Sequence, residues 1–295
     1  MANPWEIGDA LAMGSWNFSY VGDYRKAREL AEQGVDRAEG EAVGVALHNM
    51  AWLTYAEFWL GNWDRIVTDL APRVRGIMGE RATEPPYFSG HQFGIEAFIH
   101  TARRDREMTE SRELLTRMVD RAEAAAGPQG GLMFKAWEAW IRAREGDVTE
   151  AINRLDRLSS QPMVRPIVDA VRAGVILDAG LFSTADEFIT GSRDYAQWAG
   201  IEALPPHLDR LEAAKALEDG DPATAIAQLT EAARGFEGLG TQWELARTEL
   251  WLAEAYIESG RDDNAMEAIE SARPVLERLG SLLEIERARS LLARL

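Results

Sequence analysis

Apolar residues recur along this chain at spacings of three and four, the pattern of helices that bury one face. The pattern is clear at Leu250, Ala253 and Ile257, and again from Ile269 to Leu276. Alternation of β-branched and polar residues, which is typical of half-buried strands, is absent from the sequence. The pattern therefore predicts an all-α protein.

A short motif separates the predicted helices: a glycine is followed five residues later by alanine, or once by isoleucine. Its six copies begin at Gly22, Gly61, Gly146, Gly180, Gly220 and Gly260. Successive glycines lie 39, 85, 34, 40 and 40 residues apart. A fixed period of this size is typical of stacked two-helix units. We expect the glycine to end the first helix in a left-handed conformation and the small residue to lie where two antiparallel helices cross.

The motif resembles that of the tetratricopeptide repeat (TPR) family. Its glycine and alanine match the family's small residues at the turn and the crossing, and LAEAY from Leu252 to Tyr256 is similar to the family's LGxxY segment. Except for the step from Gly146 to Gly180, the spacing exceeds the usual period of about 34 residues. Long units of this kind are similar to the sensor arms of bacterial signal-transducing ATPases and transcription regulators. The resemblance implies a right-handed superhelical solenoid whose first helices line a concave face.

The glycine spacing predicts about seven antiparallel helix pairs and a C-terminal capping helix in a single array over residues 1–295. The third pair carries no glycine motif, and its turn is expected shortly after Ala102. Irregular segments flank this pair, so we expect the array to bend or open there. The pairs are expected at about 5–40, 41–86, 87–130, 131–163, 164–200, 201–240 and 241–280, and the capping helix at 281–295.

The first helices differ along the chain in what they present to the concave face. The first four units present aromatic side chains, whereas the last three present charged ones such as Arg210, Arg247 and Glu254. An aromatic concavity with few polar groups is typical of a site for a small molecule or an apolar peptide. Packing between helices is the alternative role for each ring. The predicted ligand-binding residues are Trp16, Tyr20, His48, Tyr55, Phe58, Trp59, Phe98, His100, Trp140 and Arg144.

Signals for catalysis and metal binding are weak. Glu96 and His100 stand four residues apart on one helix face, as an acid–base pair or two metal ligands do, but no metal motif accompanies them. Phosphate-binding and serine-nucleophile motifs are absent from the sequence. We therefore expect no catalytic residue, no metal and no cofactor. If the chain is an enzyme, the candidate acids and bases are His48, Glu57, Glu96 and His100.

Composition narrows the range of partners. The formal net charge is −17, with acidic residues spread along the chain, which disfavours nucleic acid and membrane surfaces as partners. The absence of cysteine excludes disulfides and thiolate chemistry. The N-terminal segment lacks the basic and apolar regions of a signal peptide, so a cytoplasmic location is expected.

The sequence thus favours a TPR-type binding module. Its aromatic-rich N-terminal half would hold an apolar small molecule or a peptide segment, as a protein-interaction scaffold or as a ligand-sensing arm in signalling. The alternative is an enzyme that uses a His/Glu acid–base pair in the same concavity. A third possibility is that the chain is an arm of a larger regulator.

Overall fold

The computed structural model describes residues 3–38, 40–78, 90–126 and 131–295. In these ranges the chain forms helices and turns and no strand, which confirms the all-α prediction. The chain divides into two compact units, unit 1 (Met1–Val168) and unit 2 (Asp169–Leu295), and each is described by itself. The single array over residues 1–295 stays a prediction. None of the described helices is long and apolar enough to cross a membrane.

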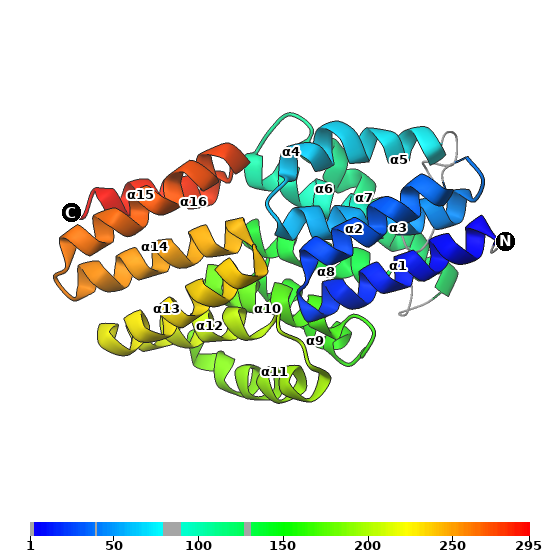
Figure 1. Ribbon diagram of the computed structural model, residues 1–295. Coiled ribbons are helices and arrows are strands. Elements are labelled where there is room, and N and C mark those ends of the chain that lie inside the picture. The colour runs from blue at the N-terminus through cyan, green and yellow to red at the C-terminus, as the bar shows by residue number, and fades with distance from the viewer. Residues whose placement is uncertain (1–2, 39, 79–89, 127–130) are drawn as a thin grey trace. The chain divides into compact units, whose positions relative to one another are not determined.

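Unit 1 is built from helices that pair with their neighbours in the chain (Figure 1). In three of its four pairs each partner is one helix, whereas the second partner of the other pair is broken into α4, a π-helical turn and α5. The elements are α1 (Pro4–Val21), α2 (Tyr24–Ala38), α3 (Val43–Trp59), α4 (Trp63–Arg65), η1 (Ile66–Leu70), α5 (Ala71–Met78), α6 (Gly90–Arg103), α7 (Met108–Ala126), α8 (Leu132–Arg144) and α9 (Val148–Ser159).

Unit 2 continues the same construction with three pairs and a closing helix. The division between the units falls inside α10, so unit 2 begins within the first helix of its first pair. The elements are α10 (Arg165–Ala179), η5 (Phe182–Thr184), α11 (Ala185–Ala199), α12 (Pro205–Glu218), α13 (Pro222–Leu239), α14 (Gln242–Glu258), α15 (Asp262–Leu279) and α16 (Leu282–Leu292).

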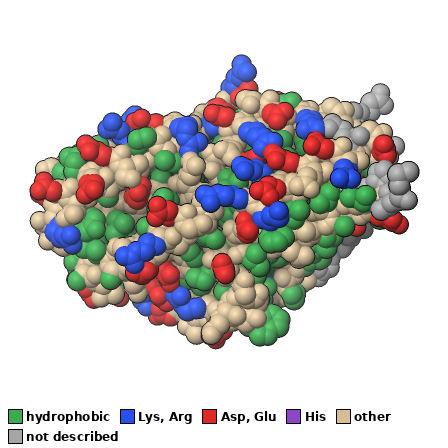
Figure 2. Space-filling model, in the orientation of Figure 1, with side chains coloured by type: hydrophobic (Ala, Val, Ile, Leu, Met, Phe, Trp, Pro, Cys, Tyr) green, Lys and Arg blue, Asp and Glu red, His purple; other side chains and the backbone are tan. Residues whose placement is uncertain are grey.

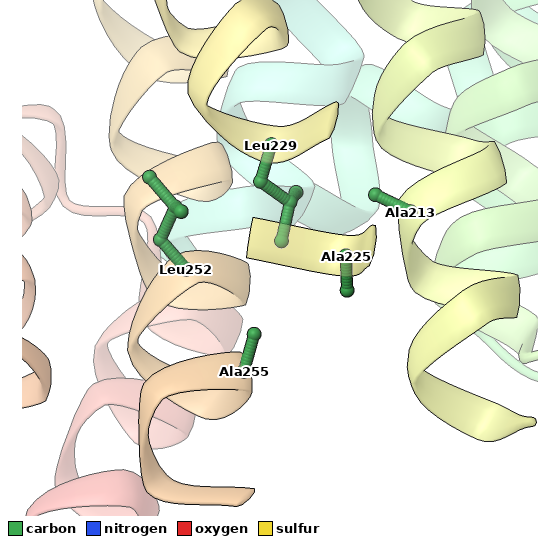
Figure 3. Close-up of a cluster of buried hydrophobic side chains, with 5 residues drawn as sticks. All are labelled: Ala213, Ala225, Leu229, Leu252 and Ala255. Carbon is green, nitrogen blue, oxygen red and sulfur yellow. The ribbon is translucent and has the colours of Figure 1, made fainter. Parts of the chain in front are cut away.

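The glycine motif has the structural role that its spacing predicts. All six motif glycines have positive φ, from 65° at Gly180 to 102° at Gly22, a conformation that glycine adopts without steric cost. The residue five positions later is fully buried in every copy, including Ile66, where the π-helical turn begins. In Figure 3 the motif alanine Ala225 lies on α13 with Ala213 of α12 on one side and α14 on the other. Small side chains at this position therefore let neighbouring helices approach.

The third pair turns where the sequence predicts it. Helix α6 ends at Arg103 and α7 begins at Met108, so the turn falls within the segment after Ala102. Arg104 takes the left-handed conformation here, with φ 48°, in place of the missing glycine. The irregular segments expected on either side of this pair lie almost entirely outside the described residues.

Helices α6 and α8 approach closely at Gly94. A Cβ atom added there would lie 2.6 Å from three side-chain atoms of Trp137, which is itself fully buried. Gly94→Ala is therefore expected to lower the free energy of unfolding by about 1–3 kcal/mol, measured by urea denaturation. Gly76→Ala in α5 is the matched control, because nothing lies within 4 Å of its added Cβ. Equal effects of the two substitutions would contradict the close approach.

Charged side chains of both signs cover the surface. Figure 2 shows acidic and basic groups interspersed over the visible face rather than gathered into a single patch. Many of them form ion pairs between neighbouring helices, such as Arg193 with Asp209 and Glu212 at 2.9 and 3.0 Å. The net charge of −17 is thus distributed over helix faces.

Candidate functional site

The predicted aromatic residues belong to one continuous cluster in unit 1. Trp16 of α1 stacks on Trp52 of α3, with ring centroids 5.7 Å apart. Phe58, also in α3, meets Phe98 of α6 at 5.5 Å, and Phe98 meets Trp140 of α8 at 4.6 Å. The cluster, which we call the aromatic cluster, therefore joins the first helices of all four pairs of unit 1.

Most of the predicted ligand-binding residues are buried within or beside this cluster. The buried ones are Tyr55, Phe58, Trp59, Phe98, His100 and Trp140. Four side chains are half-buried and offer some surface: Trp16, Tyr20, His48 and Arg144. The buried rings form the core of unit 1, and ligand binding by any of the ten residues stays a prediction.

Several ring nitrogens of the aromatic cluster are buried, and the following have no hydrogen-bond partner among the described residues. They are Nε1 of Trp16, Nε1 of Trp52 and Nε2 of His91. Nε1 of Trp137 donates to Nδ1 of His91 at 3.2 Å, so the proton of the neutral imidazole sits on Nε2. Burial lowers the pKa of His91 to about 3, with His48 adding to the shift, and the ring is neutral at physiological pH. All three nitrogens are therefore N–H donors that lack an acceptor.

The structure brings together two of the four candidate acid–base residues. Nε2 of His100 lies 3.8 Å from Oε1 of Glu96, which also accepts from Arg75 at 2.6 Å. Nδ1 of His100 lies 2.9 Å from Asp105. The pair therefore sits inside a set of ion pairs at the turn between α6 and α7.

His48 and Glu57 have other partners. Nδ1 of His48 lies 3.7 Å from Asp9, and burial lowers the pKa of this histidine although Asp9 raises it. The carboxylate of Glu57 is fully buried and accepts hydrogen bonds from Asn62 and Arg65. The neighbours of His48 and Glu57 therefore account for both side chains as structural contacts.

His100, Asp105 and Glu107 form a further cluster at this turn. One ligand atom of each lies within 4.8 Å of the others. Asp105 also accepts from the backbone N–H of Glu107 at 3.2 Å, and Glu107 pairs with Arg106 at 2.5 Å. Hydrogen bonds and ion pairs within the turn between α6 and α7 therefore account for these side chains.

The pKa of His100 predicts a measurable pH dependence. Burial lowers this pKa, but the hydrogen bonds to Glu96 and Asp105 outweigh burial and raise it above the ordinary value. The charged form therefore stabilises the fold fully below the unfolded pKa of about 6.5, and this stabilisation is lost as pH rises through the folded pKa. The wild type should exceed His100→Gln in free energy of unfolding by more at pH 6 than at pH 8.5. An equal difference at both pH values would contradict the charge interaction.

Unit 2 contains a cavity of ≈ 450 Å³, which we call the unit 2 cavity. The cavity is lined by α10, η5, α14 and α16. Helices α10 and α14 are the first helices of two pairs, and α16 is the closing helix. Its apolar lining is Leu177, Phe182, Leu250, Trp251 and Leu283. Its charged lining is Asp178, Arg247, Glu254, Glu284 and Arg287.

Buried ion pairs form the floor of the unit 2 cavity. Arg247, which is 4% exposed, pairs with Asp178, with Glu244 at 3.1 Å and with Glu284 at 3.5 Å. Arg210 reaches Glu244 from the other side at 2.5 Å. Burial lowers the pKa of Arg247, but its three carboxylates outweigh burial and raise it. Burial raises the pKa of Glu244, yet the two arginines lower it to about 2.

One wall of the unit 2 cavity combines an aromatic ring with a charge. The guanidinium carbon of Arg287 lies 3.7 Å from the centroid of Trp251, and Arg287 donates to Glu254 at 2.6 Å. Phe182 contacts Trp251 edge to face at a centroid distance of 6.1 Å. The sequence placed Arg247 and Glu254 on the inner face. It gave no signal for Trp251, Phe182 or Asp178, because their meeting depends on packing between separate helices.

At two positions of unit 2 the sequence predicts an exposed side chain and the structure buries it: His207, which follows Pro205 and Pro206 at a predicted helix start, and Glu284, which the charged C-terminal capping helix is predicted to present on its outer face. His207 is 3% exposed and lies edge to face on Phe236 at 4.8 Å. Burial lowers its pKa to about 3. Glu284 is buried and accepts from Ser281 at 2.5 Å.

A second cavity, of ≈ 490 Å³, lies in unit 1 between α7 and α8. It borders the third pair, where the sequence predicts that the array opens. Its arginines are paired: Arg112 with Glu145 at 2.5 Å, Arg142 with Glu138 at 2.9 Å, and Arg117 with Glu113 at 3.8 Å. The charged side chains of this cavity are thus paired with one another or with nearby residues, as Glu138 also pairs with Arg154 and Arg142 with Asp147.

Comparisons with known proteins bear on the fold. No protein-family model and no curated protein matches the sequence. Among solved structures, the chain is similar to a Rap protein complexed with competence and sporulation factor, with a TM-score of 0.63 and 11% sequence identity. The match covers 97% of this chain and 80% of that chain. At this identity the likeness shows the fold, a TPR-like helical-repeat solenoid. The similarity to sensor arms of bacterial regulators stays a prediction.

Proposed function

We propose that this chain is a helical-repeat binding module that holds a peptide segment, and that the unit 2 cavity receives one side chain of that peptide. The observation that carries the proposal is the mixed lining of this cavity, which combines the aromatic rings of Trp251 and Phe182 with the buried guanidinium of Arg247. A peptide offers both kinds of group, since its side chains bury apolar surface while its backbone forms hydrogen bonds.

The charged lining disfavours an apolar small molecule in the unit 2 cavity. Such a ligand would take water away from Asp178, Glu254 and Arg287 without offering hydrogen bonds in return, which is costly. The similarity in fold to a Rap protein that was solved with a bound factor supports binding as the role of the scaffold. As a peptide-binding module the chain would serve as an interaction scaffold or as a sensor arm.

A second candidate site is the edge of the aromatic cluster at Trp16 and Tyr20. Both side chains are half-buried, and the unpaired N–H groups of Trp16, Trp52 and His91 favour a ligand oxygen that accepts hydrogen bonds. Tyr20 donates to the backbone carbonyl of Met163, a contact that a ligand at this edge would have to displace. An apolar small molecule that carries a carbonyl group fits this edge better than it fits the unit 2 cavity.

Selection from a random heptapeptide library on the immobilised chain tests the proposal. Peptides recovered by the wild type should bind Trp198→Ala equally well and Trp251→Ala at least about tenfold more weakly. Trp198 is the matched control, because it lies in the same unit and is 83% exposed. If every recovered peptide binds Trp251→Ala as tightly as the wild type, the unit 2 cavity is not the site. Loss of binding with Trp16→Ala instead would favour the edge of the aromatic cluster.

A further inference from the structure

Helix α1 carries few charges. Its 18 residues include two charged side chains, Glu6 and Asp9, whereas the 15 residues of α2 include seven. The carboxylate of Asp9 lies 3.7 Å from His48. On a chain whose net charge is −17, the outer face of α1 is therefore a stretch of surface where the repulsion of another acidic protein is weak.

The same helix exposes large apolar side chains. Trp5, Met13, Phe18 and Val21 are between 37% and 53% exposed, while α1 packs its other face against α2 and α3. Figure 2 shows hydrophobic side chains gathered along the part of the surface that α1 forms. Single exposed apolar residues are common on soluble proteins, but four on one helix form a patch, and such patches mark sites of association.

One outward stripe runs the length of α1. Residues at spacings of three and four share a helix face, and the exposed residues of α1 that follow this spacing form the stripe. Met13 lies near its middle, and Ala10 is small enough for a second helix to approach closely. The stripe consists of Glu6, Ala10, Met13, Asn17 and Val21.

Exposed charges at the two ends of this stripe are opposite in sign. Glu6 lies in the first turn of α1, and Arg25 lies in the first turn of α2, next to the C-terminal end of α1. An antiparallel pair of α1 helices, with Met13 of one copy against Met13 of the other, brings each Glu6 to the end where Arg25 of the other copy lies. The surface is thus complementary to itself, as a two-fold interface between identical chains requires.

We propose that α1 is the contact between two copies of this chain, which pack their α1 helices antiparallel about a two-fold axis near Met13. The contact buries the apolar patch of α1 and pairs Glu6 of each copy with Arg25 of the other. It is independent of the peptide site proposed above, because its residues belong to unit 1 and the unit 2 cavity belongs to unit 2.

Sedimentation velocity of the wild-type chain tests the association without any variant. Over roughly 1–100 µM the measured mass should rise from that of one chain to twice that value, as expected when two copies associate reversibly. A chain that stays monomeric throughout this range would overturn the proposal, and the patch on α1 would then belong to a different partner.

Met13→Glu locates the contact. The change places two like charges at the axis of the dimer and should raise the dimer Kd by about a hundredfold. Met266→Glu is the matched control, because Met266 lies in unit 2 and both methionines are 38% exposed. The control should dimerise as the wild type does. A dimer that survives Met13→Glu as well as Met266→Glu would show that a different surface holds the copies together. Circular dichroism of both variants separates a loss of fold from a loss of association.

Charge reversal tests the antiparallel arrangement. Glu6→Arg and Arg25→Glu should each raise the dimer Kd by about fivefold, since each change puts like charges together at both ends of the interface. The double variant restores opposite charges and the net charge of the wild type, and it should return to within about twofold of the wild-type Kd. Single reversals without effect, or a double variant as weak as the single ones, would contradict the antiparallel contact.

The absence of cysteine allows a direct test of the axis. Met13→Cys should form a disulfide-linked dimer on mild oxidation, because the axis brings residue 13 of the two copies together. Met266→Cys should remain monomeric on a non-reducing gel. Equal cross-linking of the two variants would show that the axis does not pass near Met13.

Discussion

Replacing Arg247 by methionine is expected to lower the free energy of unfolding of unit 2 by about 3–5 kcal/mol, the usual cost of removing one partner from a buried set of ion pairs. Methionine keeps much of the length of the side chain and removes the charge. The change leaves Asp178 and Glu284 without their shared guanidinium partner, and it leaves Glu244 with Arg210 alone. The contact of Arg247 with the ring of Trp243, at 4.6 Å, is lost as well.

Urea denaturation followed by circular dichroism measures the effect of Arg247→Met. Arg234→Met is the matched control in the same unit, because Arg234 pairs at the surface with Glu231 and both side chains are about two-thirds exposed. The control should change the free energy of unfolding by less than about 0.5 kcal/mol, as surface ion pairs contribute little. An Arg247→Met variant as stable as Arg234→Met would show that the buried ion pairs do not hold α10, α14 and α16 together.

The fold could be predicted because its signals are local. A glycine that ends a helix and a small residue five positions on obey rules of backbone conformation and close packing that operate within one helix pair. The observed φ of 70° at Gly260 and the buried Ala265 follow from these rules. The spacing of such motifs predicted the number of pairs without any knowledge of what the pairs enclose.

Local rules of helix periodicity could not predict the role of the aromatic residues. Helix α3 is apolar on nearly its whole circumference, from Met50 and Trp52 to Phe58 and Trp59, and such a helix is buried all round. Periodicity therefore could not separate a concave, ligand-facing side from a core-facing side. The glycine register grouped these rings correctly as neighbours, but their burial depends on how closely α1, α6 and α8 surround them.

The unit 2 cavity depends on contacts that are remote in sequence. Asp178 and Arg247 are 69 residues apart, and only packing brings them together. The inner-face register identified Arg247 and Glu254 as charged positions, but charged side chains in a sequence are by default solvated. Packing between separate helices places Arg247 and Glu254 in the lining of a cavity instead of on the solvated surface.

Trp140→Ala is expected to lower the free energy of unfolding of unit 1 by about 3–5 kcal/mol, because the ring is 0% exposed and its removal leaves a large void. The indole contacts Phe98 at 4.6 Å and stacks on Trp137 at 5.9 Å, so the loss also disturbs the packing of α6 against α8. Thermal and urea denaturation measure the effect, and near-ultraviolet circular dichroism reports the packing of the remaining rings.

Trp198→Ala is the matched control, the same substitution at a ring that is 83% exposed, and it should cost less than about 0.5 kcal/mol. The comparison decides between the two roles that the sequence left open for the aromatic residues. A ring that holds the core together lowers stability on removal, with or without a ligand. A ring that serves only as a ligand contact leaves stability near that of the control and changes affinity alone. If Trp140→Ala behaves like Trp198→Ala in denaturation, the core role is wrong and the ligand-binding role of the aromatic cluster gains strength.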